Sequence, residues 1–181
     1  MSKAILFIFS GLPAVGKSTL ARFLVKDFGA VYLRIDTIEQ GLKDLCHIDV
    51  EGEGYRLAYR MTADNLQLGN NVVADSCNPI ELTRREWEEV AVNNNCRFVN
   101  VEVICSDKTE HKKRAEQRNA EVANMKLPVW NDIENREYHE WHKSRIVIET
   151  AGKTIKQCQT ELKEKVADSL LKKEMVKNMK A

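Results

Sequence analysis

Two patterns of apolar positions follow one another along the chain: short continuous apolar runs, and longer stretches with apolar residues at helical spacing. The run AILFIFS at residues 4–10 is typical of a strand buried on both faces. Residues 19–29 then place Leu20, Phe23, Leu24 and Phe28 at helical spacing, and Gly29 is placed to end that helix. We therefore expect the first strand to lie at the centre of a sheet.

The same alternation continues to the end of the chain and predicts an α/β fold, in which helices cross over between parallel strands. Apolar runs predict further strands at residues 30–36, 71–76, 97–105 and 145–152. Helical spacing predicts helices over 37–68, with a break at EGEG, and over 81–92, 107–118 and from 154 onward. Residues 119–132 have little periodicity. We expect a five-stranded parallel sheet with helices on both faces.

Length and pattern together predict one domain over residues 1–171, with a small helical lid at about 118–143 and a Lys-rich tail at 172–181. The charge balance is nearly even, with 28 Lys and Arg against 27 Asp and Glu, so nucleic acid is neither demanded nor excluded as a partner. The five cysteines form an odd number without CxxC spacing, which fits neither a disulfide framework nor a zinc site. A reducing cytoplasm is the expected location.

The N-terminal apolar run resembles the core of a secretion signal because it follows Lys3. It is short, however, and it leads into a Gly-Lys-Ser turn where a signal would have a small-residue cleavage site. No other apolar run approaches the roughly 18 to 20 residues that cross a bilayer. We expect no membrane association.

The turn after the first strand, GLPAVGKS at residues 11–18, satisfies the phosphate-loop pattern G-x-x-x-x-G-K-S between a strand and a helix. Its glycines permit the backbone N–H groups to turn inward around an anion, at the positive end of the following helix. Lys17 is expected to reach the β- and γ-phosphates, and Ser18 to hold Mg²⁺. The structural alternative is a strand-to-helix turn that happens to contain glycine. The candidate residues for binding ATP are Gly11, Ala14, Val15, Gly16, Lys17, Ser18 and Thr19.

Two carboxylates close predicted strands, and ligands of open parallel sheets gather at the carboxyl ends of strands. Asp36 is expected either to accept the proton of a substrate hydroxyl or to align that hydroxyl. Its structural alternative is a helix N-cap, with Glu39 completing a capping box. Asp75 ends the apolar run VVAD, as expected for a Walker-B-like carboxylate near Mg²⁺. A turn or N-cap acid would explain Asp75 as well.

Two arginines, Arg114 and Arg118, are four residues apart on a predicted helix and so share one face. The aperiodic segment with Pro128 and Trp130 follows directly and is expected to form a hinged lid over the phosphates. An arginine beside such a lid neutralises charge on a transferred phosphoryl group. The alternative is a solvated, charged helix face. The pattern does not decide which of the two is the lid arginine.

The order of motifs resembles the small P-loop kinases often labelled AAA-family ATPases, similar in plan to chloramphenicol phosphotransferase, gluconate kinase and the polynucleotide kinase domain. The segments that carry this resemblance are GLPAVGKSTLA, LRID, VVADSCNP, VICSD with HKKRAEQR, and the stretch that ends in RIVIETAG. They span residues 4 to about 152. The resemblance implies a three-layer P-loop NTPase fold, with Gly16, Lys17 and Ser18 binding ATP and magnesium. It also implies Asp36 as the acceptor-hydroxyl base and Arg118 or Arg114 as the lid arginine.

These observations favour an ATP-dependent kinase that phosphorylates a hydroxyl of a small molecule, with Lys17, Asp36, Arg114 and Arg118 as candidate catalytic residues and Ser18 and Asp75 as candidate metal ligands. One alternative is a polynucleotide or nucleoside 5′-hydroxyl kinase. A second alternative is a regulatory NTPase or binding module without an acceptor. The acceptor, the preference for ATP or GTP and the oligomeric state do not follow from the sequence.

Overall fold

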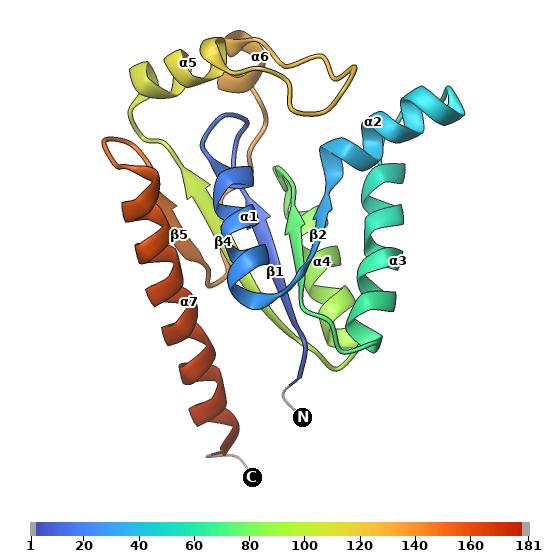
Figure 1. Ribbon diagram of the computed structural model, residues 1–181, viewed down its shortest axis with the longest axis vertical. Helices are drawn as coiled ribbons and strands as arrows, with labels where there is room; N and C mark the ends of the chain where they lie inside the picture. The colour runs from blue at the N-terminus through green and yellow to red at the C-terminus, as the bar shows by residue number, and fades with distance from the viewer. Residues whose placement is uncertain (1–2, 179–181) are drawn as a thin grey trace.

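The protein is built around a five-stranded sheet in which every neighbouring pair of strands is parallel (Figure 1). The computed structural model describes residues 3–178, and their side chains as far as Lys172. The strands are β1 (Ile5–Ser10), β2 (Val31–Arg34), β3 (Val72–Asp75), β4 (Arg97–Ile104) and β5 (Ile146–Glu149), in the spatial order β2-β3-β1-β4-β5. The first strand lies at the centre, as its continuous apolar run predicts.

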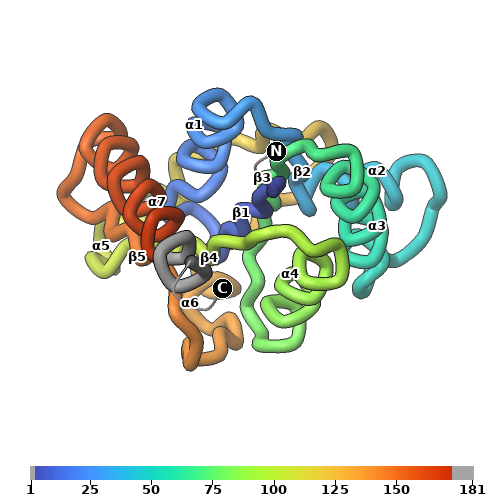
Figure 2. Tube along the Cα trace, turned by 90° about the horizontal axis from the view of Figure 1, so that it is seen from below, coloured from blue at the N-terminus to red at the C-terminus, as the bar shows by residue number. Residues whose placement is uncertain are grey.

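Helices cover both faces of the sheet and complete three layers (Figure 2). They are α1 (Lys17–Phe28), α2 (Ile35–Cys46), α3 (Glu53–Gln67), α4 (Glu81–Asn93), α5 (Lys108–Gln117), α6 (Trp130–Glu134) and α7 (Ile155–Asn178). The helices α1 and α7 cover one face, and α3 and α4 cover the other. Above the carboxyl ends of the strands lie α5 and α6 (Figure 1). The predicted α/β fold, a five-stranded parallel sheet with helices on both faces, is thus confirmed.

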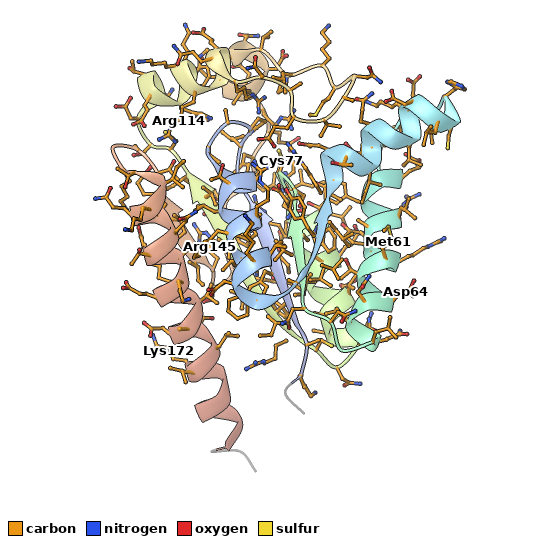
Figure 3. All side chains as sticks on the ribbon, viewed as in Figure 1. Met61, Asp64, Cys77, Arg114, Arg145 and Lys172 are labelled. Carbon is orange, nitrogen blue, oxygen red and sulfur yellow. The ribbon has the colours of Figure 1, made fainter. Side chains whose placement is uncertain are left out.

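Alternate residues of β1 pack on opposite sides, so the strand is apolar at every position. Phe7 joins Leu24 of α1 and Leu162 of α7 in one core cluster, whereas Ile8 joins Trp87 of α4 in the other, and all five side chains are fully buried. Figure 3 shows the side chains that fill the space between the sheet and its helices. This packing fixes the carboxyl end of β1 and therefore the start of the loop that follows it.

The second strand is shorter than its pattern predicts. Residues 30–36 were expected to be extended, but β2 ends at Arg34 and α2 begins at Ile35 without a connecting loop. Asp36 therefore lies in the first turn of α2 and does not close the strand. Arg34 occupies the N-cap position, and no side chain caps the helix there, so the alternative of an Asp36 cap completed by Glu39 is also wrong.

The helix that carries the two candidate arginines also ends early. Its last residue is Gln117, and the backbone of Arg118 is extended, with φ −75° and ψ 146°. Arg114 and Arg118 consequently do not share a helical face. The change of direction at Arg118 separates the environments of the two side chains.

Other predicted boundaries hold more closely. The break at EGEG appears as residues 47–52 between α2 and α3. The helix α7 continues to Asn178, through the start of the predicted Lys-rich tail, whose last three residues lie outside the described range. Within the described part of the chain, no helix has both the length and the apolar character needed to span a bilayer.

Candidate active site

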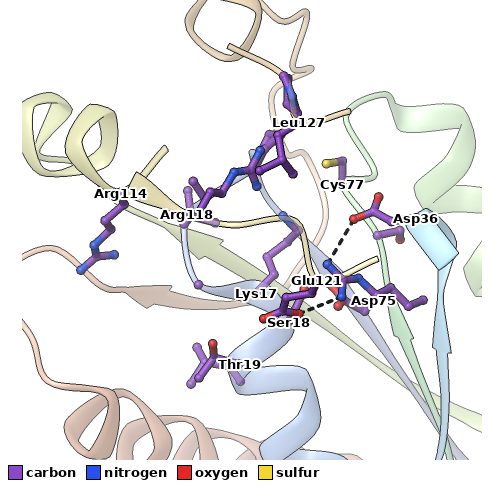
Figure 4. Close-up of a pocket in the computed structure, with 18 of the residues that line it drawn as sticks. Lys17, Ser18, Thr19, Asp36, Asp75, Cys77, Arg114, Arg118, Glu121 and Leu127 are labelled. Carbon is purple, nitrogen blue, oxygen red and sulfur yellow. Dashed lines mark hydrogen bonds and ion pairs between the residues drawn. The ribbon is translucent and has the colours of Figure 1, made fainter. Parts of the chain in front are cut away.

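A cavity of about 900 Å³ opens at the carboxyl ends of the strands. Its floor is the loop between β1 and α1, and its walls come from α2, from the residues after β3 and from the start of α7. Its cover comes from residues 118–136, the first part of the segment 118–143 that is called the lid segment below and in which only α6 is helical. Figure 4 shows Asp36 and Arg114 on opposite sides of this cavity, with Lys17 and Arg118 between them in this view.

The structure brings nearly all of the predicted site residues to this one cavity. Gly11 is the exception: this first residue of the loop is buried and does not line the cavity. Whether each lining residue has its predicted role stays a prediction. The predicted residues that line the cavity are Ala14, Val15, Gly16, Lys17, Ser18, Thr19, Asp36, Asp75, Arg114 and Arg118.

Gly11 and Gly16 each have a φ that L side chains rarely adopt, 135° and 99°. A Cβ on Gly11 would lie 2.2 Å from the carbonyl oxygen of Val103, so the loop leaves β1 directly against β4. Ala14 also has a positive φ of 67°. Among the described residues, the backbone N–H groups of residues 14–18 find no acceptor. The loop is therefore free to donate them to an anion.

Lys17 is almost completely buried, with 8 % of its surface exposed. Its Nζ donates a hydrogen bond of 2.8 Å to the carbonyl oxygen of Leu12, within the same loop. Burying a polar nitrogen without a hydrogen-bond partner is costly, so this bond helps to hold the side chain in place. The arrangement holds the lysine over the loop, where a phosphate oxygen can take the place of the carbonyl.

Two side chains that sequence reasoning missed hold the loop from outside. His111 of α5 is buried, with Nε2 2.8 Å from the carbonyl oxygen of Pro13, and its ring packs edge-on against Trp130. The hydroxyl of Thr150 lies 3.0 Å from the carbonyl oxygen of Val15. A histidine three positions before Arg114 in a strongly charged helix was the available signal. The two contacts fix the loop relative to α5 and to the residue that follows β5.

Ser18 and Asp75 line the same cavity and fit a Mg²⁺ ion, because hydroxyl and carboxylate oxygens are the ligands this cation prefers. Asp75 is 3 % exposed. Its Oδ2 accepts a 2.7 Å hydrogen bond from Tyr32, and Oδ1 has no partner among the described residues. Burial, and then the Asp75 carboxylate, raises the pKa of Tyr32, so the phenol stays protonated and orients Asp75.

The guanidinium groups of the two candidate arginines have opposite environments. Arg114 donates to the hydroxyl and carbonyl oxygens of Thr150, at 2.8 and 2.9 Å, and pairs with Glu110. In Arg118, by contrast, the buried Nε and Nη2 have no hydrogen-bond partner within the described part of the chain. Burial lowers the pKa of Arg118, against the opposing charge of Asp36. Arg114 is therefore committed to the structure, and Arg118 has donors free for a ligand.

The wall from α2 places two acids in the cavity near Arg34 and Arg118. Arg34 Nη2 lies 3.6 Å from Asp36 Oδ2, and the Asp36 side chain is 39 % exposed. Glu39 lines the cavity one turn further along α2. Burial, and then the charge of Asp36, raises the pKa of Glu39. Asp36 is thus accessible from the cavity and oriented by a neighbouring cation.

Glu121 of the lid segment reaches into the same region and was not anticipated. It accepts hydrogen bonds of 2.7 and 3.1 Å from Arg22 of α1 and one of 2.8 Å from Arg34 of β2. The hydrogen bond from Arg22, and then the charges of both arginines, lower the pKa of Glu121 to about 2. No local pattern in the aperiodic segment could reveal these partners, which lie 87 and 99 positions away.

The solved structures with a fold similar to this one include several kinases. A candidate kinase from Chloroflexus aurantiacus has a TM-score of 0.69 at 15% identity, over 93% of this chain and 98% of that one. A gluconokinase from Sinorhizobium meliloti has a TM-score of 0.66 at 12% identity, over 96% and 99%. The APS kinase CysC of Mycobacterium tuberculosis, solved with AMPPNP and APS, has a TM-score of 0.62 at 16% identity, over 90% and 98%.

At these identities the likeness concerns the fold, and it confirms the expected resemblance to small P-loop kinases at that level. Comparison with curated protein sequences finds no match. The model of the AAA domain family matches residues 6–137, from β1 through the phosphate loop to the lid segment. Since this match spans more than half of the chain, the protein belongs to the AAA domain family.

Proposed function

We propose that the protein is an ATP-dependent kinase that transfers the γ-phosphoryl group to a hydroxyl of a small-molecule acceptor, with Mg²⁺ as cofactor. One observation carries the proposal. The phosphate loop and Asp36 line a single cavity, and between them (Figure 4) Arg118 has two buried nitrogens that find no partner among residues 3–172. A free arginine would also serve an NTPase, but a carboxylate placed to accept the proton of a hydroxyl favours transfer to an acceptor.

The loop end of the cavity binds the triphosphate in this account. The N–H groups of residues 14–18 donate to phosphate oxygens. The side chain of Lys17 gives up its hydrogen bond to the carbonyl oxygen of Leu12 and contacts the β- and γ-phosphates. Ser18 and Asp75 would hold Mg²⁺, which would supply positive charge to offset the negative charge of the phosphates. The side lined by Arg114, Lys153 and Ile155 is left for the nucleoside.

The α2 side of the cavity receives the acceptor. Asp36 accepts the proton of the acceptor hydroxyl, and the oxygen of that hydroxyl attacks the γ-phosphorus. The bond from that phosphorus to the β–γ bridging oxygen breaks, and ADP leaves with the electron pair. The free donors of Arg118 stabilise the negative charge on the transferred group. The lid segment excludes water, which would otherwise compete as acceptor.

Substitution of Asp36 tests this assignment. In Asp36→Asn, transfer of labelled phosphoryl to an acceptor should fall by about 100-fold or more, while AMPPNP binding stays within about twofold of wild type. Asp64→Asn, at an exposed position on α3, is the matched control and should retain full transfer. Full transfer by Asp36→Asn would contradict the assignment of Asp36 as the base.

A reducing, cytoplasmic location is part of the proposal and rests on the odd cysteine count.

A further inference from the structure

Glu121 places a carboxylate in the region between the phosphate loop and Asp36, where the nucleotide chemistry requires none. It is held there by three hydrogen bonds from two arginines, at 2.7, 2.8 and 3.1 Å. The arginines belong to the rigid elements α1 and β2, whereas Glu121 belongs to a part of the lid segment without regular structure. The positive partners are thus preorganised, and their negative partner is the one that can leave.

Arg34 connects this carboxylate to the proposed chemistry. Its Nη1 donates to Glu121, and its Nη2 lies 3.6 Å from Asp36. Its Nε is buried and has no partner among the residues that the structure describes, and only 15 % of the side chain is exposed. One guanidinium therefore contacts the candidate base and the lid carboxylate, and still has a donor to offer. A small molecule whose acidic group binds Arg34 would bring a nearby hydroxyl to Asp36.

We propose that Arg22 and Arg34 form the binding site for an anionic group of the acceptor, and that Glu121 occupies this site until the acceptor displaces it. The group is a carboxylate, sulfate or phosphate, since each matches the paired N–H donors of a guanidinium. The inference rests on the proposed kinase function. It predicts that the acceptor is a hydroxyl compound bearing an acidic group, and that neutral polyols are poor acceptors.

Inorganic sulfate is a direct probe, provided that the phosphate loop is already filled. Sulfate binding is measured by calorimetry in saturating AMPPNP and Mg²⁺. Glu121→Gln removes the internal competitor and should bind sulfate about tenfold more tightly, while Arg34→Gln should bind it at least about tenfold more weakly. Glu89→Gln and Arg85→Gln, an exposed pair on α4, are the matched controls and should behave as wild type.

A second arm uses pairs of acceptors that differ only in the acidic group, such as gluconate with glucitol and glycerate with glycerol. The acidic member should be phosphorylated with a kcat/KM at least about tenfold higher, and Arg34→Gln should remove most of that preference by raising KM. Circular dichroism of each variant verifies folding.

The outcomes separate the two proposals. If Glu121→Gln binds sulfate no better than wild type, Glu121 is only a structural latch and the anion site is overturned. Displacement of AMPPNP by sulfate would overturn it as well, because sulfate would then compete for the site of the nucleotide's phosphates and would not bind separately at the arginines. Equal phosphorylation of neutral and acidic acceptors would refute the anion site and leave the kinase standing. Absence of AMPPNP binding in the wild type would contradict the kinase function itself.

Discussion

A Cβ atom on Gly11 would lie 2.2 Å from the carbonyl oxygen of Val103, on the strand paired with β1. No rotation of a side chain can relieve that contact, because the backbone fixes the position of the Cβ atom and the atom that it meets is a backbone oxygen. The φ of Gly11, 135°, also disfavours any L residue. We expect Gly11→Ala to lower the free energy of unfolding by roughly 2–4 kcal/mol, measured by urea denaturation.

Substitutions of two other glycines distinguish the clash with Val103 from the strain of a positive φ. Gly69 has a φ of 83° with open space around it, so Gly69→Ala should lower the free energy of unfolding by only about 1 kcal/mol. Gly41 lies within α2, also in open space, and Gly41→Ala should raise it by roughly 0.5–1 kcal/mol. A loss in Gly11→Ala no larger than that in Gly69→Ala would show that β4 does not approach the loop as described.

Arg114 and Arg118 should fail in different ways when each is changed to glutamine. Arg118 has free donors, so Arg118→Gln should lower kcat by roughly 100- to 1000-fold and leave AMPPNP affinity within about threefold. Its thermal unfolding midpoint should not fall, because the substitution removes two buried nitrogens that have no hydrogen-bond partner among the described residues. Arg114→Gln should lower that midpoint and weaken AMPPNP binding, because the bonds to Thr150 are lost. The reverse pattern would assign the transfer role to Arg114.

Asp75 and Tyr32 offer a graded test of the metal site. Asp75→Asn should raise the Mg²⁺ concentration for half-maximal activity by at least about tenfold, and Tyr32→Phe should raise it less, because Tyr32 only orients the carboxylate. The measurement is activity titrated with MgCl₂ at saturating ATP. An unchanged Mg²⁺ requirement in Asp75→Asn would exclude Asp75 as a ligand.

The ion pairs of Glu121 should stabilise the protein in a defined pH range. Because the folded-state pKa is lowered from its ordinary value of 4.5 to about 2, this contribution is fully present above pH 4.5 and declines as the pH falls toward 2. The difference in unfolding midpoint between wild type and Glu121→Gln should therefore be constant above about pH 5 and shrink below about pH 4. A difference independent of pH would mean that the charge of Glu121 is not the stabilising feature.

The sequence predicted those features that depend on local pattern. The continuous apolar run of β1 identified the central strand, because burial on both faces leaves no polar positions. The spacing of Gly11, Gly16 and Lys17 identified the loop, since each has a backbone or charge role at a fixed position. The topology of a parallel sheet then brought Asp36 and Asp75 to the same edge.

Features that depend on contacts between distant segments could not be predicted in this way. Glu121 lies in a segment without periodicity, and its arginine partners are on α1 and β2. The helix α5 ends at Gln117, and Thr150 accepts hydrogen bonds from Arg114. These two features leave free donors on Arg118 and not on Arg114. Helix ends and long-range pairings follow from tertiary packing, which single-residue preferences do not record.

The transfer of label from γ-labelled ATP tests the central claim most directly. Wild type and Lys17→Ala are compared with Mg²⁺ across acidic and neutral hydroxyl compounds, nucleosides and 5′-hydroxyl oligonucleotides, so that the nucleic-acid alternative is included. The account predicts a labelled small acidic product with the wild type and none with Lys17→Ala. Label recovered only as free phosphate, or transferred equally well without Lys17, would contradict it.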